Sequence, residues 1–187
     1  MYFDIEVYNR GLKEFPKPQD APRSISSISY KFNDEETKLI LSNSMKMDQN
    51  YPKEDDNILV VSDEKNLLEE FCRVLKKYEP NLLTGWNCLG FDIIYIFNRM
   101  KKLKMNINKL SPFGYASINP NRHGEVFIEG MYILDMMDLY KNFTESVEEN
   151  YSLGYIAEKN LGKGKVKYTG SLDELYEKDI NKFIEYS

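Results

Sequence analysis

Residues 1–8 read Met-Tyr-Phe-Asp-Ile-Glu-Val-Tyr, a run in which polar and apolar side chains alternate. Such alternation is typical of a β-strand, because successive side chains of a strand point to opposite faces. The apolar residues at positions 3, 5 and 7 therefore share one face, and Asp4 and Glu6 share the other. Along a strand these two carboxylates lie roughly 7 Å apart. The strongly apolar face predicts that this strand is central in its sheet.

Strand patterns and helix patterns alternate along the rest of the chain. The elements expected up to residue 105 are strands at 28–32, 38–42 and 57–62, a helix at 63–78 capped by Ser62, a strand at 82–86 and a helix at 91–105. Those expected beyond it are a hairpin around 119–121, a strand at 131–134, helices near 135–143 and 152–160, and a last helical region opened by the capping box Ser171–Glu174. The first strand and the three short strands that follow it predict an antiparallel meander. The strand–helix–strand–helix order that follows is typical of an α/β sheet.

Composition and charge exclude several classes of protein. The chain has 187 residues, 42% of them hydrophobic, which is enough for one domain with its own core. The 25 Lys and Arg residues against 30 Asp and Glu residues give a net charge of −5. This balance argues against a general nucleic-acid coat or a polybasic membrane anchor, but not against a nucleic-acid enzyme whose site is acidic because it holds metal ions. No apolar run approaches the ~20 residues that span a bilayer.

Three acidic residues are the candidates for a chemical site. Asp4 and Glu6 repel each other and lose hydration beside a core, unless a cation lies between them. Oxygen ligands of this kind suit Mg²⁺ or Mn²⁺, whereas the alternative is a strand with one solvent-facing side. Asp92 follows the strand at 82–86, at the sheet edge where ligands bind in open α/β sheets. The alternative interpretation of Asp92 is an acid in the first turn of a helix, where the helix dipole favours it. Its occurrence together with the Asp-x-Glu motif favours the metal site.

These motifs resemble those of a known family. Phe3-Asp4-Ile5-Glu6 is similar to the first exonuclease motif of family B DNA polymerases, and Asn87-x3-Phe91-Asp92 is similar to the second. The resemblance is strongest to the polymerases of T-even-like phages. It extends over almost the whole chain, through residues 15–18, 134–143, 151–153 and 163–170. It implies an α/β, RNase H-like (DEDD exonuclease) fold, with a mixed central β-sheet and helices on both sides.

The third motif of this family is Tyr-x3-Asp, and Tyr186-Ser187 falls at its first two positions, where the chain stops. The single histidine, His123, lies far from that position, so the tyrosine (DEDDy) subtype fits. The resemblance implies that residues 1–187 are a single exonuclease domain excised from a larger polymerase. Because the last carboxylate is missing, we expect this chain to be weakly active or inactive.

The implied function is proofreading, in which a 3′–5′ exonuclease removes mispaired nucleotides from the single-stranded 3′ end of DNA. The resemblance implies hydrolysis with two divalent ions, Mg²⁺ or Mn²⁺, held by Asp4, Glu6 and Asp92. It also places Glu6 near the attacking water, which Tyr186 helps to orient. The expected partners are DNA and the polymerase domain of the same parent chain. No membrane association is expected, and the default is a monomer in the cytoplasm, that of the host if a phage encodes the chain.

Substrate contacts are expected from aromatic and basic side chains. Asn87 and Phe91 match the second motif and are predicted to shape the nucleotide pocket. Phe15 either stacks on a base of a frayed 3′ end or packs under its proline-rich loop. Residues 93–124 contain no Asp or Glu, and their bases either attract phosphate or form a solvated helix face. These bases are Arg99, Lys101, Lys102, Lys104, Lys109 and Arg122.

Two other functions remain open from the sequence. One is a stand-alone DEDD nuclease acting on DNA or RNA, which a polymerase domain in the flanking sequence would exclude. The other is a non-catalytic single-strand-binding module, for which the missing carboxylate is the argument. Retention of Asp4, Glu6 and Asp92 counts against this second alternative, because a pure binder has no use for buried acids.

Overall fold

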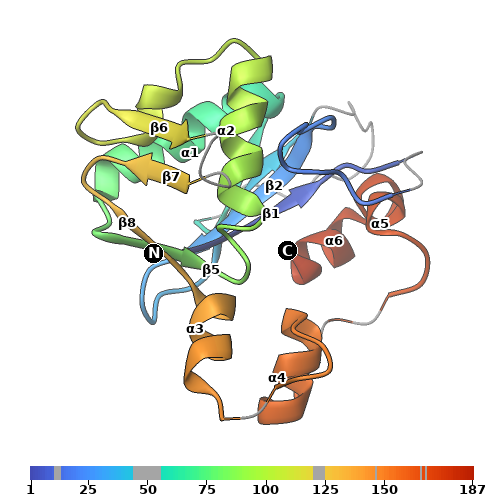
Figure 1. Cartoon of the computed structure of the whole chain (residues 1–187). Helices are drawn as coiled ribbons and strands as arrows, with labels where there is room; N and C mark the ends of the chain where they lie inside the picture. Colours follow the sequence, from blue (N-terminus) through green and yellow to red (C-terminus); the bar gives the residue numbers. More distant parts are fainter. Residues whose placement is uncertain (11–13, 44–55, 120–124, 146, 165, 167) are drawn as a thin grey trace.

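The computed structural model describes residues 1–10, 14–43, 56–119, 125–145, 147–164, 166 and 168–187 (Figure 1). Its strands are β1 (Tyr2–Val7), β2 (Ile25–Lys31), β3 (Lys38–Ser42), β4 (Ile58–Val61), β5 (Leu82–Gly85), β6 (Ala116–Asn119), β7 (Glu125–Ile128) and β8 (Tyr132–Asp135). Its helices are α1 (Glu64–Tyr78), α2 (Asp92–Lys102), the 3₁₀ helix η1 (Ile107–Leu110), α3 (Met136–Phe143), α4 (Leu153–Leu161), α5 (Leu172–Lys178) and α6 (Ile180–Tyr186). None of the helices in these described ranges is long and apolar enough to cross a bilayer.

A six-stranded mixed sheet in the order β4-β3-β2-β1-β5-β8 forms the centre of the molecule. β1 lies between β2, to which it is antiparallel, and β5, to which it is parallel. The prediction of a central first strand is therefore confirmed. The predicted meander is correct for β1 to β3 but wrong for β4, which runs parallel to β3. An apolar run predicts a strand but not its direction, and the connecting residues 44–55 lie outside the described part of the chain.

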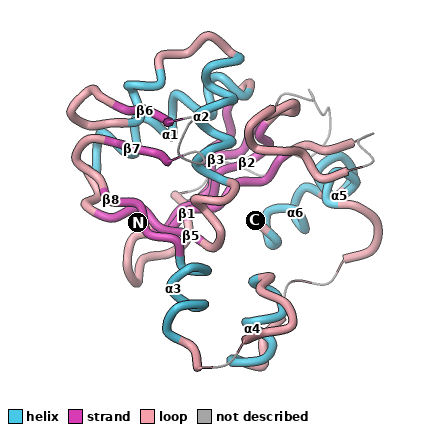
Figure 2. Tube along the Cα trace, in the orientation of Figure 1, coloured by secondary structure: helices cyan, strands magenta, loops and turns pink. Residues whose placement is uncertain are grey.

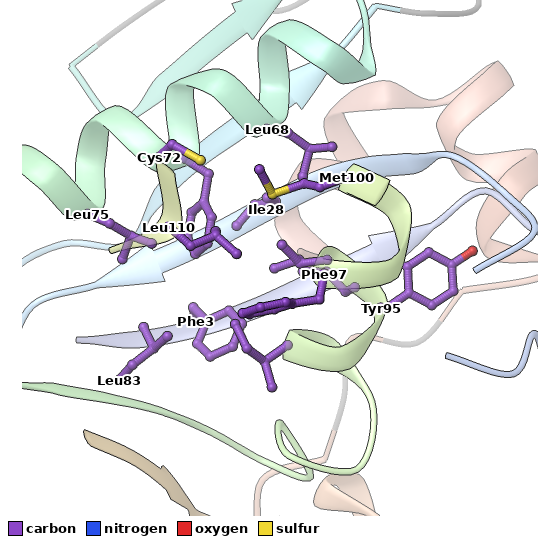
Figure 3. Close-up of a cluster of buried hydrophobic side chains, with 14 of the residues drawn as sticks. Phe3, Ile28, Leu68, Cys72, Leu75, Leu83, Tyr95, Phe97, Met100 and Leu110 are labelled. Atoms are coloured by element: carbon purple, nitrogen blue, oxygen red, sulfur yellow. The ribbon is translucent and has the colours of Figure 1, made fainter. Parts of the chain in front are cut away.

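Helices cover both faces of this sheet (Figures 1 and 2), as the family resemblance implies. On one face, α1 and α2 enclose the main core, in which Phe3 and Ile28 from the sheet meet Leu68 and Phe97 from the helices (Figure 3). On the other face, α5 and α6 form a smaller cluster against β3. Its buried members are Leu41, Leu175, Tyr176, Ile180 and Phe183. Asp4 and Glu6 belong to this second face because they alternate with the core residues of β1.

The helix starts follow local capping chemistry. α5 begins with the predicted capping box, in which the Ser171 hydroxyl accepts from the Glu174 amide and the Glu174 carboxylate accepts from the Ser171 amide. At α1 the predicted cap is wrong by one residue, because Asp63 rather than Ser62 accepts from the Asn66 amide, at 2.9 Å. A carboxylate at this position also interacts favourably with the positive end of the helix dipole.

The predicted hairpin is confirmed as the antiparallel pair β6–β7, although its tip at residues 120–124 lies outside the described residues. The other predicted boundaries agree to within a few residues. α2 ends at Lys102 rather than 105, and β8 ends at Asp135. Asp135 also contacts the loop between β5 and α2, through the Asn87 amide.

Candidate functional site

β1 presents its two carboxylates beside small neighbours on β2. Asp4 lies opposite Ser29, and Glu6 lies opposite Ser27. Asp4 is exposed and Glu6 is half-buried, whereas the intervening Ile5 is buried in the core. Because serine side chains are short, they leave space beside the acids on this face of the sheet.

Asp92 is the first residue of α2 and is only 4% exposed. Its Oδ1 accepts a hydrogen bond from the Ile5 amide at 3.3 Å. The pairing of β1 with β5 is confined to Tyr2 and Thr84, so the Ile5 amide has no strand neighbour on that side. The Asp92 carboxylate takes the place of a strand carbonyl there. It is thereby attached to the residue that lies between Asp4 and Glu6.

The electrostatics of Asp92 follow from this placement. Burial raises its pKa well above the ordinary range, and the charges of Asp4 and, to a lesser extent, Glu6 raise it further. The hydrogen bond from Ile5 lowers the pKa and offsets part of this effect. The three predicted acids therefore interact across two elements far apart in the chain.

The chemistry of these donors fits a hard divalent cation. All three offer carboxylate oxygens, which Mg²⁺ and Mn²⁺ prefer, and a cation would relieve the repulsion that raises the pKa of Asp92. Within the described residues, however, no group of three or more His, Cys, Asp or Glu side chains is arranged to hold a metal ion. Asp4, Glu6 and Asp92 thus form an acidic cluster rather than an assembled cage.

The loop between β5 and α2 has a constrained backbone. Asn87 adopts a left-handed conformation with φ of 61°, and its side chain lies against Gly90, where a Cβ atom would come within 2.3 Å of Asn87 Oδ1. The Phe91 ring lies 5.0 Å from that of Phe15 and 5.3 Å from that of Tyr95. Phe15 is 73% exposed, so it is not packed beneath its own loop. The structure brings Phe15 against Phe91, the residue that precedes Asp92.

The end of α6 reaches the same face of the sheet as Asp4 and Glu6. The Ser187 hydroxyl lies 3.5 Å from that of Ser27, the partner of Glu6 on β2. The preceding residue, Tyr186, packs edge-on against Tyr168, with ring centroids 5.2 Å apart. The structure therefore places Tyr186 one residue from a contact with the strand that lines the acidic cluster.

Contacts that the sequence does not reveal hold α5 onto the segment after β1. The Tyr8 hydroxyl donates to the Glu177 carboxylate, which also accepts from Arg10 at 2.5 Å. The Asn9 amide donates to Asp173 Oδ1 at 2.7 Å. These partners are more than 160 positions apart, so the sequence shows the acidic residues of α5 but not what they bind. They fix the helix pair that carries Tyr186.

A cavity of about 390 Å³ opens beside Asp4. It is lined by β1 and β2, by the end of β5 and the loop after it, and by α3, α4 and the end of α6. The lining includes Asp4, Ser29, Trp86, Met136, Leu153 and Ser187. Its walls are largely apolar, and their polar side chains include those of Asp4, Lys31 and Thr37 and of the two serines.

The acid-free basic stretch is only partly available for binding. Arg99 is largely buried in an ion pair with Glu64, at 2.6 Å, and Lys109 pairs with Glu69 at 2.8 Å. Arg122 lies outside the described residues. The remaining candidates, Lys101, Lys102 and Lys104, are exposed.

Comparison with known proteins agrees with this arrangement. A family model for the exonuclease domain of family B DNA polymerases matches residues 1–156. The chain belongs to this family. It is 36% identical over 131 residues to the DNA-directed DNA polymerase of Escherichia phage RB69, a match covering 66% of this chain and 14% of that protein. The corresponding polymerase of Enterobacteria phage T4 is 34% identical over 131 residues, which are 66% of this chain and 15% of that protein.

The similarity to the family also reaches beyond phages. DNA polymerase 1 of Sulfurisphaera ohwakuensis is 30% identical over 193 aligned residues, which cover 98% of this chain and 20% of that protein. The exonuclease domain described here therefore spans only a small part of the length of each of these relatives.

A glycine fixes the close approach of the first two motifs of this exonuclease domain. A Cβ atom at Gly85 would lie 2.6 Å from the backbone oxygen of Phe3. Gly85→Ala is therefore expected to push β5 away from β1 and to lower the free energy of unfolding by about 1–3 kcal/mol, measured by urea denaturation. Gly164→Ala is the control, because its Cβ would meet only the end of Glu158 at 3.9 Å. Equal stability of the Gly85 variant and the wild type would contradict this account.

Proposed function

We propose that this exonuclease domain removes nucleotides from the 3′ end of single-stranded DNA, by two-metal hydrolysis, as the proofreading domain of a longer polymerase. Residues 1–187 would form a single domain of that protein. The observation that carries the proposal is the hydrogen bond of the buried Asp92 to Ile5, between Asp4 and Glu6. It places three carboxylates within electrostatic reach of one another at a sheet edge typical of ligand sites.

The acidic residues would act as ligands. Asp4, Glu6 and Asp92 would hold the Mg²⁺ or Mn²⁺ ions, which activate water and stabilise the leaving oxygen when bound. Glu6, half-buried on β1, would lie beside the attacking water. Tyr186 would orient that water through its hydroxyl, from the α6 end that contacts β2.

The aromatic residues would bind the DNA. Phe15 is exposed beside Phe91 and offers a face on which a base can stack, which is worth about 1–3 kcal/mol per base. Asn87, held in its left-handed conformation, would border the nucleotide pocket. The exposed lysines at the end of α2 would attract the phosphates.

Digestion of a labelled oligonucleotide tests this proposal. The chain extended at its C-terminus by about ten residues of the parent polymerase is incubated with a 5′-labelled single strand and Mg²⁺ or Mn²⁺. We expect stepwise shortening from the 3′ end. Asp4→Ala should lower the rate on the order of 10³-fold, because it removes a metal ligand. Asp34→Ala, which removes an exposed turn carboxylate, should leave the rate unchanged.

The same assay separates the alternatives. An extended chain that digests nothing, or an Asp4→Ala variant that stays fully active, would exclude the proposed mechanism. Binding of the oligonucleotide without digestion would instead favour a single-strand-binding module. We expect little turnover from the 187-residue chain, and full activity would show that the last carboxylate of the third motif is dispensable.

A further inference from the structure

Asp135 is a buried carboxylate at the end of β8, beside Gly85 of β5. It is 3% exposed and accepts three hydrogen bonds from backbone amides. Its Oδ1 accepts from Asn87 and from Met137, each at 2.9 Å. Its Oδ2 accepts from Leu89, also at 2.9 Å. A buried charge is costly unless it is hydrogen-bonded, and bonds of this charge-assisted kind are stronger than neutral ones.

Two of these bonds fix the loop that leads to Asp92. Asp135 holds the amide of Asn87, and the carbonyl of the same residue accepts from the Gly90 amide at 3.0 Å and from the Phe91 amide at 2.9 Å. The next carbonyl, that of Cys88, accepts from Ile93 at 3.0 Å. The loop thus passes directly into the first turn of α2. Its geometry determines where the Asp92 carboxylate meets β1.

The third bond links the loop to the cavity. By accepting from the Met137 amide, Asp135 caps α3, and the first residue of that helix, Met136, lines the cavity beside Asp4. Both oxygens of Asp135 are engaged with backbone amides. This side chain is therefore occupied with the loop and the helix start, and does not itself line the cavity.

We propose that Asp135 is a positioning residue for divalent-metal binding, which acts by holding the 87–91 loop so that Asp92 faces Asp4. The inference rests on the proposed function, because it assumes that Asp92 is a metal ligand. Asp135 would act from outside the coordination sphere of the metal, because its hydrogen bonds orient the loop that leads to the ligand Asp92. Loss of such partners typically weakens metal affinity 10–100-fold.

Manganese titration of the whole chain tests the inference. In Asp135→Asn one carboxylate oxygen is replaced by the NH₂ of a side-chain amide. This group cannot accept a hydrogen bond from the backbone amide that it faces. We expect Mn²⁺, followed by its electron paramagnetic resonance signal, to bind at least 10-fold more weakly to this variant. Asp138→Asn, which changes an exposed acid of α3, the helix that Asp135 caps, should bind as the wild type does. Circular dichroism establishes that each variant is folded at the titration temperature.

A second measurement uses only the wild-type chain. Because coupling between sites is reciprocal, Mg²⁺ should slow hydrogen exchange of the Asn87 and Leu89 amides more than that of amides in the middle of α1. Unchanged Mn²⁺ affinity in a folded Asp135→Asn, or no selective protection in the wild type, would overturn the positioning role. A wild-type chain that binds neither ion would instead overturn the proposed metal site.

Discussion

Glu64→Ala is expected to lower the free energy of unfolding by about 3–5 kcal/mol, because it leaves a largely buried arginine without its partner. Glu64 is 6% exposed. Its Oε1 accepts from Arg99 Nε at 2.6 Å and from the Ile25 amide at 2.8 Å, and its Oε2 accepts from Arg99 Nη2 at 2.8 Å. One carboxylate thus joins α1, α2 and β2.

The same network ties Arg99 to the segment before β2. Its guanidinium donates to the Ala21 carbonyl and to the Ser24 hydroxyl, both at 3.2 Å. When Glu64 is removed, the charge on Arg99 stays largely buried and the Ile25 amide loses its acceptor. Both effects act in the same direction, which is why the expected loss is large.

Urea unfolding of two matched variants isolates this effect. Glu70→Ala removes the partner of Arg73, whose side chain is 73% exposed, and should cost less than about 1 kcal/mol. The double change Glu64→Leu with Arg99→Met should recover much of the loss, because it removes both charges together. A cost for Glu64→Ala no larger than that for Glu70→Ala would show that the pair is not a structural one.

Arg99 also shows where prediction from sequence ends. The absence of acids between residues 93 and 124 indicates a basic surface. The acid that neutralises Arg99 lies 35 positions earlier, on another helix, and it becomes a partner only when α1 and α2 pack side by side. Local composition records the charge of a segment, but the burial of that charge is decided by tertiary packing.

The candidate site likewise has one part that local sequence predicts and another that only tertiary packing creates. The alternation around Asp4 and Glu6, and the position of Asp92 after a buried strand, follow from local patterns and from family resemblance. The hydrogen bond from Ile5 to Asp92 spans 87 positions and depends on where β5 ends. Asp135 is visible in the sequence only as a residue at a helix start, because its bonds to Asn87 and Leu89 need β8 to lie beside β5.

Asp92→Asn is expected to stabilise the metal-free domain and at the same time to abolish its stabilisation by metal. The buried carboxylate has a raised pKa, first because of burial and then because of Asp4. Between its unfolded and folded pKa values the folded state therefore binds more protons than the unfolded state. Stability is consequently lost as pH rises through this window. An asparagine does not ionise, and its oxygen can still accept from the Ile5 amide.

The advantage of the asparagine variant should therefore grow as pH rises from about 4, the ordinary range for an aspartate. Addition of Mg²⁺ should reverse the order. At a concentration 100 times its dissociation constant, an ion that binds only the folded wild type adds about 2.7 kcal/mol, whereas the variant, lacking one ligand, should gain little. Such a reversal is expected where a residue that is needed for function lowers the stability of the metal-free protein.

Thermal unfolding at pH 5 and pH 8, with EDTA or with Mg²⁺, measures both effects. Asp34→Asn serves as the control, because Asp34 is exposed in a turn, and it should follow the wild type under all four conditions. An Asp92→Asn variant less stable than the wild type at pH 8 in EDTA would mean that its hydrogen bond outweighs the burial of its charge. Equal stabilisation of variant and wild type by Mg²⁺ would show that Asp92 does not bind the ion. The two results together decide whether this buried acid is retained for packing or for metal, since only a ligand should cost stability without metal and restore it with metal.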